Sequence, residues 1–422
     1  MITIFIAKRE NGEKIHLLYN CNEELLRRMR QQERFFCVAC GKEVQMKLGK
    51  QKSWHFAHKK VDSCLAFYEA ESMYHRHGKE LLYRWFERQN FHVDIEHYLP
   101  QIQQRPDIFI ERAGRKIAIE YQCANLSIEQ LYKRTYSYWR AGIQVIWIIG
   151  GNQLKKQSAY WMKFSSLMAF SLQSYPQPFL IFFCSKQKAF MKCAFLTSFS
   201  TSVSFSHTIY LSTETTTFEL LFSPVPFQKE ILDREWKQRK DYFRKNALPI
   251  WNYNYKSLLR LLYQFKCTPA SFPSEIGVPL PSEIGVPLPS GFAFQTNPFI
   301  WQAFLYMKCI GELAVGECIT LQYVCSYVKK YTKRRMLPYF SKHIWKVAVT
   351  EYMTFLCYTG VLRKVETYKY RKIRGIVMLK TEEEVMKYDE TCLAYALSLF
   401  EAKYNMREGK GDIIKTDCEG IT

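Results

Sequence analysis

Two carboxylates in the first third of the chain are spaced for metal chemistry. Asp107 follows Pro106 at the start of a short apolar segment, and Glu120 lies near the end of the next one, with twelve residues between the two acids. If the two segments pair as a hairpin, both carboxylates come to one end of it. Carboxylate oxygens suit Mg²⁺ or Mn²⁺. Such an ion can activate a water and neutralise charge on a phosphodiester.

Three polar residues on a preceding helical segment extend this acidic set. Glu71, His75 and Lys79 recur every fourth residue, which places them on one face of a helix. They offer an acid, a base or phosphate ligand, and a fixed cation. Gln122, at the end of the second apolar segment, shares the strand face of Glu120. Each residue taken singly is more often structural, so the prediction of a catalytic site depends on their joint occurrence.

Cysteines and histidines near the N-terminus have the spacing of a structural zinc site. Cys37 and Cys40 form a C-x₂-C pair, and His55, His58 and Cys64 follow. Thiolate and imidazole are donors that zinc prefers, and four of them complete a tetrahedron. Five candidates compete for four positions: Cys37, Cys40 and His58, with either His55 or Cys64. The alternative is a cysteine knuckle without a metal.

Two further helical segments carry residues suited to DNA. One has Arg134 and Tyr138 one turn apart, where they could contact a phosphate and stack on a base. A later basic segment carries Lys237, Arg239 and Lys240 with interleaved aromatic residues. The alternative for both is a helix face that packs against a sheet or is simply solvated.

The acids and their neighbours fall in one α/β unit. The residue pattern predicts a helix, three strands, a second helix and a further strand, in that order. The last strand, Val145–Ile149, is a continuous apolar run, typical of a strand buried on both faces. Much later, the octapeptide Pro-Ser-Glu-Ile-Gly-Val-Pro-Leu occurs twice in tandem over 273–288. So many prolines cannot continue a helix or a central strand, so we expect an exposed linker there.

The amino-acid composition indicates which kind of partner the chain binds and in which cellular compartment it is expected. The chain has 422 residues, with 60 Lys and Arg against 39 Asp and Glu, a net charge of +21. This excess favours a polyanion such as nucleic acid. No apolar run approaches the roughly 18 residues of a membrane span. Fourteen cysteines without a secretory signal predict the reducing cytoplasm rather than a disulfide framework.

The motifs resemble two known groups of proteins. The element order with Pro106-Asp107 and Glu120-Tyr121-Gln122 resembles the PD-(D/E)XK, restriction-endonuclease-like nuclease superfamily. The cysteine pair followed by His55-Phe-Ala-His58, directly before that core, resembles the competence protein CoiA family of bacteria. This resemblance implies a zinc-finger-like N-terminal region, an α/β nuclease core and a mainly helical C-terminal region. It also implies natural transformation, with incoming single-stranded DNA as substrate at the recombination stage and a recombinase as partner.

The resemblance also assigns roles within the core. Asp107 matches the motif aspartate, Glu120 the second acid, and Glu71 the acid of the leading helix. Gln122 stands where the superfamily motif has lysine, and a neutral amide can hold a water but supplies no charge. Lys79 or Lys116 would then provide the cation, and Lys79 or His75 would steady the phosphate.

We expect five parts along the chain. They are a hairpin and zinc-finger-like region over 1–66, a nuclease-like core over 67–152 that could extend to about 225, a basic helical segment over 226–270, the proline-rich linker over 271–291, and a mainly helical, winged-helix-like region over 292–422.

Two functions compete. The first is Mg²⁺-dependent phosphodiester hydrolysis on DNA, which the acidic set favours because acids repel phosphate unless a metal lies between them. The second is a non-cleaving DNA-binding accessory of the recombinase with the same fold, which the missing motif lysine favours. A general repair or junction nuclease is less favoured because of the Cys/His region.

Overall fold

The structure, a computed structural model, describes most of the chain. The described residues are 5–17, 22–38, 40–49, 54–58, 72–245, 256–264, 267–268, 278–377, 379 and 381–404. They form two compact units. The first comprises 1–154, 181–192 and 209–221, and the second comprises 155–180, 193–208 and 222–422.

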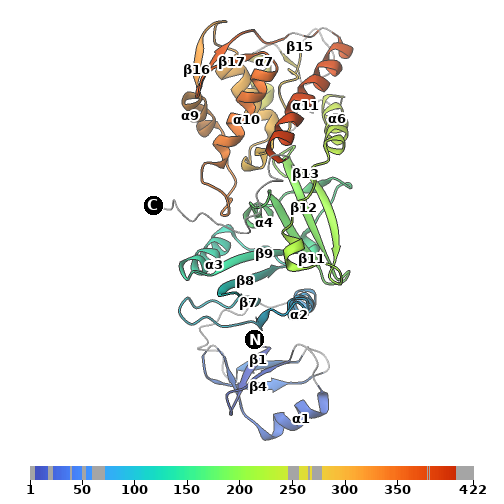
Figure 1. Ribbon diagram of the computed structural model, residues 1–422, viewed down its shortest axis with the longest axis vertical. Helices are drawn as coiled ribbons and strands as arrows, with labels where there is room; N and C mark the ends of the chain where they lie inside the picture. The colour runs from blue at the N-terminus through green and yellow to red at the C-terminus, as the bar shows by residue number, and fades with distance from the viewer. Residues whose placement is uncertain are drawn as a thin grey trace. The chain divides into compact units, whose positions relative to one another are not determined.

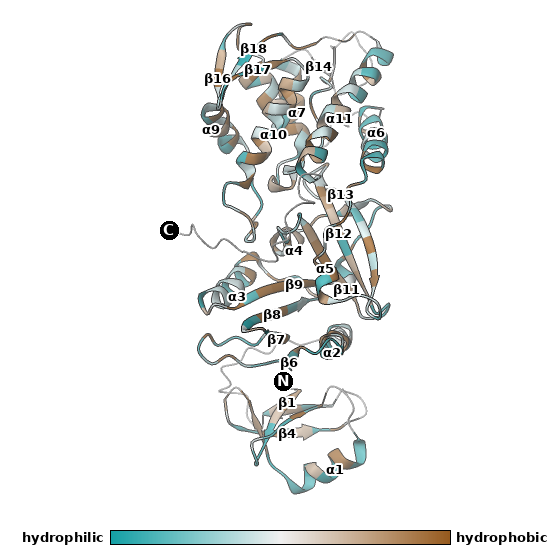
Figure 2. Cartoon of the chain, viewed as in Figure 1, coloured by the Kyte–Doolittle hydropathy of each residue, from teal (hydrophilic) through white to brown (hydrophobic). Residues whose placement is uncertain are grey.

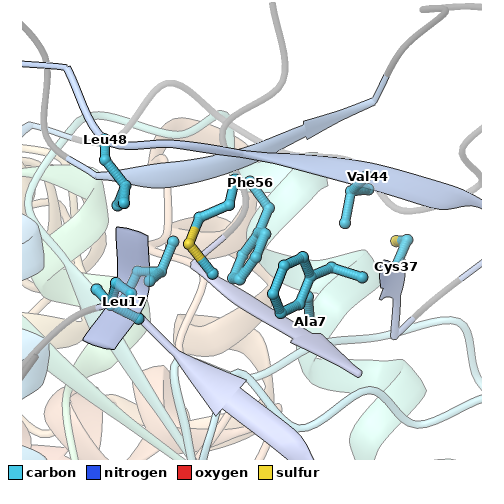
Figure 3. Packing of buried hydrophobic residues seen from close by; sticks show 9 residues of the cluster. Ala7, Leu17, Cys37, Val44, Leu48 and Phe56 are labelled. Carbon is cyan, nitrogen blue, oxygen red and sulfur yellow. The ribbon is translucent and has the colours of Figure 1, made fainter. Parts of the chain in front are cut away.

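The N-terminal part of the first unit contains a small antiparallel sheet (Figure 1). Its strands are β1 Ile6–Arg9, β2 Lys14–His16, β3 Phe35–Cys37, β4 Glu43–Lys47 and β5 His55–His58, in the order β2-β1-β3-β4-β5. Helix α1, Glu23–Gln32, begins after Asn22, whose side chain accepts two backbone N–H groups of the first turn. The core is a single cluster in which Ala7, Val44 and Phe56 are buried (Figure 3). This packing fixes the strand that carries Cys37 and the strand that carries His58.

The expected α/β elements follow in the expected order. They are α2 Met73–Glu87, β6 His92–Ile95, β7 Ile108–Arg112, β8 Arg115–Gln122, α3 Ile128–Arg140 and β9 Gln144–Gly150. Strands β6, β7 and β8 are antiparallel neighbours, and β9 runs parallel to β8. The sheet continues through β11 Phe179–Cys184, β12 Ala189–Ser198, β13 Val203–Ser212 and β10 Trp161–Lys163, in the order β10-β13-β12-β11-β9-β8-β7-β6.

Helices α2 and α3 cover opposite faces of β8. The side chain of Ser72 caps α2, and Ser127 with Gln130 forms a capping box at the start of α3. Neighbouring strand residues point to opposite faces. The ring of Tyr121 packs against His75 of α2, whereas the carboxylate of Glu120 is bonded from α3. The end of β8 is therefore enclosed on both sides.

The C-terminal part of the second unit is mainly helical. Its longer elements are α6 Lys229–Lys245, α7 Lys256–Gln264, α8 Pro298–Ala303, the π-helix η4 Phe304–Ile310, α9 Leu321–Tyr331, α10 Ile344–Tyr358 and α11 Glu382–Tyr404. Strands β16 Cys318–Thr320, β17 Leu362–Glu366 and β18 Lys369–Lys372 form a small sheet in the order β16-β18-β17. A helix followed by a hairpin is the arrangement behind the winged-helix-like interpretation, which stays a prediction. Figure 2 shows α6 as mostly hydrophilic.

The expectation of an exposed linker at the tandem octapeptide is wrong for its second copy. Residues 280–294 are all buried, and the side chain of Glu283 is fully buried beside Arg374. The Gln302 side-chain oxygen accepts the backbone N–H groups of Gly285 and Val286, and Trp236 Nε1 donates to the Gly285 carbonyl. Side chains thus satisfy the peptide groups that a proline-rich segment cannot pair in a helix or sheet. Most of the first copy, 273–277, lies outside the described residues.

Within the described residues, no helix is both long enough and apolar enough to cross a membrane.

Candidate active site and metal centre

Three of the five zinc-ligand candidates converge on one point. The Sγ atoms of Cys37 and Cys40 and a ring nitrogen of His58 lie within 4.8 Å of one another, and Cys40 Sγ is 3.2 Å from His58 Nε2. Burial, together with the charge of Lys42, lowers the pKa of His58. The neutral imidazole, which is the metal-binding form, is therefore favoured.

The other two candidates are not part of this group. His55 lies three residues before His58 on β5, and an odd spacing along a strand puts the two side chains on opposite faces. His55 accordingly does not join the cluster that the described residues form. Cys64 lies outside the described residues. The donor set of two thiols and one imidazole fits zinc, which would take one further ligand.

Asp107 lies at the end of the β7–β8 hairpin, as the sequence predicts. It directly precedes Ile108, which pairs with Ile119 of β8. Its Oδ2 accepts the backbone N–H of Tyr121 over 2.9 Å. From α2, His75 Nε2 lies 3.3 Å from Oδ2, and Lys79 Nζ lies 3.5 Å from Oδ1. Burial alone would raise the pKa of Asp107, but His75 and Lys79 outweigh it and hold that pKa well below its ordinary value.

Helix α2 comes this close to β8 because residue 78 is glycine. A Cβ at Gly78 would collide with the ring of Tyr121. That ring is fixed in turn, because its hydroxyl donates to the Phe183 carbonyl over 3.1 Å. The close approach lets the side chains of His75 and Lys79 reach Asp107 at the start of β7.

Glu96 is a buried acid at this site that the sequence pattern did not reveal. Its Oε1 lies 2.6 Å from Lys79 Nζ, and its Oε2 lies 3.3 Å from Arg105 Nη1. Burial acts to raise the pKa of Glu96, yet Lys79 and Arg105 lower it overall. Its φ of 51° is a left-handed conformation that is uncommon outside glycine. Glu96 and Asp107 therefore share the fully buried Lys79 ammonium.

Glu120 is held from α3 on the other face of the sheet. Its Oε2 accepts from Arg134 Nη2 and its Oε1 from the Tyr138 hydroxyl, both over 2.6 Å. Burial raises the pKa of Glu120 to about 7. The charge of Asp107 adds to this rise, and Arg134 and Tyr138 oppose it. The strand register explains this effect, because Asp107 and Glu120 directly flank the Ile108–Ile119 pair.

Comparison with known proteins covers most of the chain. Models of three domains of competence protein CoiA match it: the N-terminal domain over 18–67, the nuclease-like domain over 71–226 and the C-terminal domain over 231–386. The chain belongs to the competence protein CoiA family. It is similar to competence protein CoiA of Bacillus subtilis (strain 168), with 29% identity over 375 residues, which is 88% of this chain and 97% of that protein. No solved structure matches it.

The segment matched by the CoiA nuclease-like domain also contains the remaining catalytic candidates, Gln122 and Glu71, and the two residues predicted to bind DNA, Arg134 and Tyr138. Gln122 ends β8, and its Nε2 donates to the Ala124 carbonyl over 2.7 Å. Glu71 lies outside the described residues. Tyr138 is fully buried against Glu120, so its ring is not exposed to a base. Arg134 is the half-buried partner of Glu120.

The basic side chains of α6, the basic helix of the CoiA C-terminal region, have different surroundings. Lys240 is buried, 2.9 Å from Asp389, and donates to the Ser282 carbonyl. Lys237 pairs with Asp233 on its own helix, over 3.0 Å. Arg239 instead packs over aromatic rings. These three residues, expected from the sequence to bind DNA together, thus lie in three different environments.

Proposed function

We propose that this chain is a metal-dependent deoxyribonuclease of natural competence, with a PD-(D/E)XK core that hydrolyses phosphodiester bonds of incoming DNA at the recombination stage. Membership of the CoiA family and its nuclease-like domain support a role in competence. The observation that carries the catalytic part is the joint placement of Asp107 and Glu120 at one end of β7–β8, with Lys79 and Arg134 beside them.

The two carboxylates fit a hard divalent cation. Asp107 and Glu120 offer oxygen donors, and the His75 imidazole lies beside Asp107. A bound Mg²⁺ or Mn²⁺ would lower the pKa of a water and neutralise charge on the phosphodiester. Glu71, the acid that the resemblance assigns to the leading helix, would complete the acidic set.

The chain's own residues would orient the reactants. Gln122 donates its amide N–H to a carbonyl, so its side-chain oxygen is the acceptor that would hold the attacking water. Lys79, fixed by Glu96 and Asp107, would supply the positive charge that the motif lysine normally brings. His75 and Arg134 would steady the substrate phosphate.

A structural zinc ion at Cys37, Cys40 and His58 would stabilise the N-terminal sheet. The three ligand atoms already converge on one point. A fourth ligand from His55 or Cys64 would close the tetrahedron, and the placement of His55 on the opposite strand face favours Cys64.

One observation supports the second candidate function, a DNA-binding accessory of a recombinase that does not cleave. Both Glu120 oxygens are already engaged by Arg134 and Tyr138. A metal would have to compete with these donors, and Gln122 adds no cation. The fold would then serve binding to single-stranded DNA in the cytoplasm.

A nuclease assay separates the two functions. The wild type, Asp107→Asn and Glu120→Gln would be incubated with labelled single- and double-stranded DNA in Mg²⁺, Mn²⁺ or chelator. We expect metal-dependent cleavage that each variant reduces by about a hundredfold or more. Equal binding without cleavage by all three proteins would favour the accessory function. A Lys133→Met variant on the solvent side of α3 serves as the control for a charge change away from the site.

A further inference from the structure

A pocket in the second unit takes no part in the sites above. Its volume is about 540 Å³. Trp161 of β10, Phe199 at the turn after β12, and Glu235, Arg239 and Tyr242 of α6 contribute to its walls. Aromatic walls with a few polar groups, at this size, are typical of sites for small flat molecules.

We propose that this pocket binds an unpaired base of single-stranded DNA, with Tyr242 as the stacking ring and Arg239 as the neighbouring cation. The proposal rests on the proposed function in one respect, the choice of DNA as the polyanion. It adds a binding site that lies outside the nuclease-like acidic site and does not depend on cleavage.

Neighbouring side chains fix the position of the Arg239 guanidinium at the pocket. Its guanidinium lies 4.3 Å from the ring centre of Trp161 and 5.2 Å from that of Phe199, and Nη2 donates to the Gln157 side chain over 3.0 Å. A guanidinium stacked on rings keeps its plane fixed, so little side-chain freedom is lost on binding. This positive charge would track the phosphate next to a bound base.

Tyr242 supplies an exposed aromatic surface at the same pocket. Its residue surface is 68% exposed, whereas Trp161 and Phe199 are almost fully buried. Stacking on an exposed ring accepts any base, because every base has a π face. Two buried rings therefore line the pocket, and the ring of Tyr242 is exposed to solvent, where a base can reach it.

The carboxylate of Glu235 indicates which part of a nucleotide would enter the pocket. Its Oε2 accepts the Trp161 indole N–H over 3.1 Å and its Oε1 accepts from Arg234 Nη2 over 3.2 Å, so the carboxylate is fixed at the pocket wall. A carboxylate repels a phosphate or an acidic peptide but can accept hydrogen bonds from base amino groups. The neutral base is thus the part that fits inside, with the backbone passing on the Arg239 side.

The test measures binding of the full-length protein to a labelled single-stranded oligonucleotide in chelator, by fluorescence anisotropy. We expect Tyr242→Ala to weaken binding by about tenfold and Tyr242→Phe to retain it, because stacking needs the ring and not the hydroxyl. Tyr263→Ala is the matched control, since Tyr263, on α7, is also an exposed tyrosine, at 81% against 68% for Tyr242. Arg239→Gln should reduce the salt dependence of binding as well as the affinity.

The outcomes separate this inference from the proposed function. If Tyr242→Ala binds as tightly as Tyr263→Ala, the pocket is not the base-binding site, whether or not the protein cleaves DNA. The same conclusion follows if the wild type cleaves DNA with metal but binds no single strand in chelator. Loss of cleavage in Asp107→Asn with unchanged single-strand binding, together with weak binding by Tyr242→Ala, would support both proposals separately.

Discussion

Asp107 and Glu120 lie at the same end of the β7–β8 hairpin, and different helices hold their carboxylates. His75 and Lys79 of α2 contact Asp107, whereas Arg134 and Tyr138 of α3 bond Glu120. The pKa shifts of the two acids are opposite. His75 and Lys79 hold the pKa of Asp107 below its ordinary value, whereas burial raises the pKa of Glu120 to about 7 despite Arg134 and Tyr138. Paired acids with pKa values pushed apart are a common feature of catalytic sites.

These shifts predict two separate pH windows for the stability of the metal-free protein. The pKa of Glu120 is about 7 in the folded state and 4.5 ordinarily. The folded state therefore keeps a proton that the unfolded state has lost, and stability falls as pH rises across this window. Asp107 acts with the opposite sign, because its stabilising effect is complete above about pH 4 and is lost as pH falls.

Urea unfolding in chelator, between about pH 3 and about pH 8, measures both windows. The free energy of unfolding of Glu120→Gln, relative to the wild type, should rise with pH between about 4.5 and 7. Asp107→Asn should change the slope of the free energy of unfolding against pH only below about pH 4. Parallel curves for Glu120→Gln and the wild type would contradict the raised pKa.

Removing the buried ammonium of Lys79 should destabilise the first unit strongly. Lys79→Met leaves the carboxylates of Glu96 and Asp107 buried without their shared cation, which costs about 3–5 kcal/mol. Thermal and denaturant unfolding measure this loss. Adding Glu96→Gln to Lys79→Met should recover part of it, because one buried charge is then removed. A loss no greater than that of the exposed control Lys133→Met would mean that the network contributes little.

Much of the acidic site could be predicted from the sequence, because the signals are local. Strand alternation and a short hairpin bring Asp107 and Glu120 together, and a four-residue spacing aligns His75 with Lys79. The C-x₂-C pair and His58 are similar, since Cys37 ends β3 and His58 ends β5, the two strands that flank β4. In each case the pattern itself determines which side chains share a face.

The features that could not be predicted depend on distant partners. Glu96 follows a strand without any motif, and its role comes from Lys79 and Arg105. Lys240 belongs to a basic helix face, yet its side chain is buried in an ion pair with Asp389 of α11. The second octapeptide has the composition of a linker, but side chains such as Gln302 and Arg374 make it part of the core. Composition does not reveal such long-range pairs.

The metal content of purified variants should identify the zinc ligands. Cys40→Ser should lose the zinc, because its Sγ belongs to the three-atom cluster. His55→Ala should keep it, because His55 lies outside that cluster. Cys318→Ser, a change at an exposed cysteine, is the control and should keep it too. Elemental analysis gives the answer without any activity measurement, and full zinc content in Cys40→Ser would contradict the ligand assignment.

The tandem octapeptide allows the same substitution to be made in two identical local sequences. We expect the two substitutions to lower the free energy of unfolding by different amounts. Gly285, in the second copy, has φ +76°, and an added Cβ would collide with the ring of Phe299. Gly285→Ala should therefore cost about 3 kcal/mol from the left-handed backbone and overpacking together.

Gly277→Ala changes the same glycine in the first copy and is the matched control. It should change stability by less than about 0.5 kcal/mol if the second copy alone fills the core. Denaturant unfolding of both variants and of the double variant measures the difference. If Gly285→Ala is as mild as Gly277→Ala while the double variant is strongly destabilised, the two copies replace each other in the core. That result would contradict a fixed register, because the chain would then have shifted by one repeat to bring an intact glycine beside Phe299.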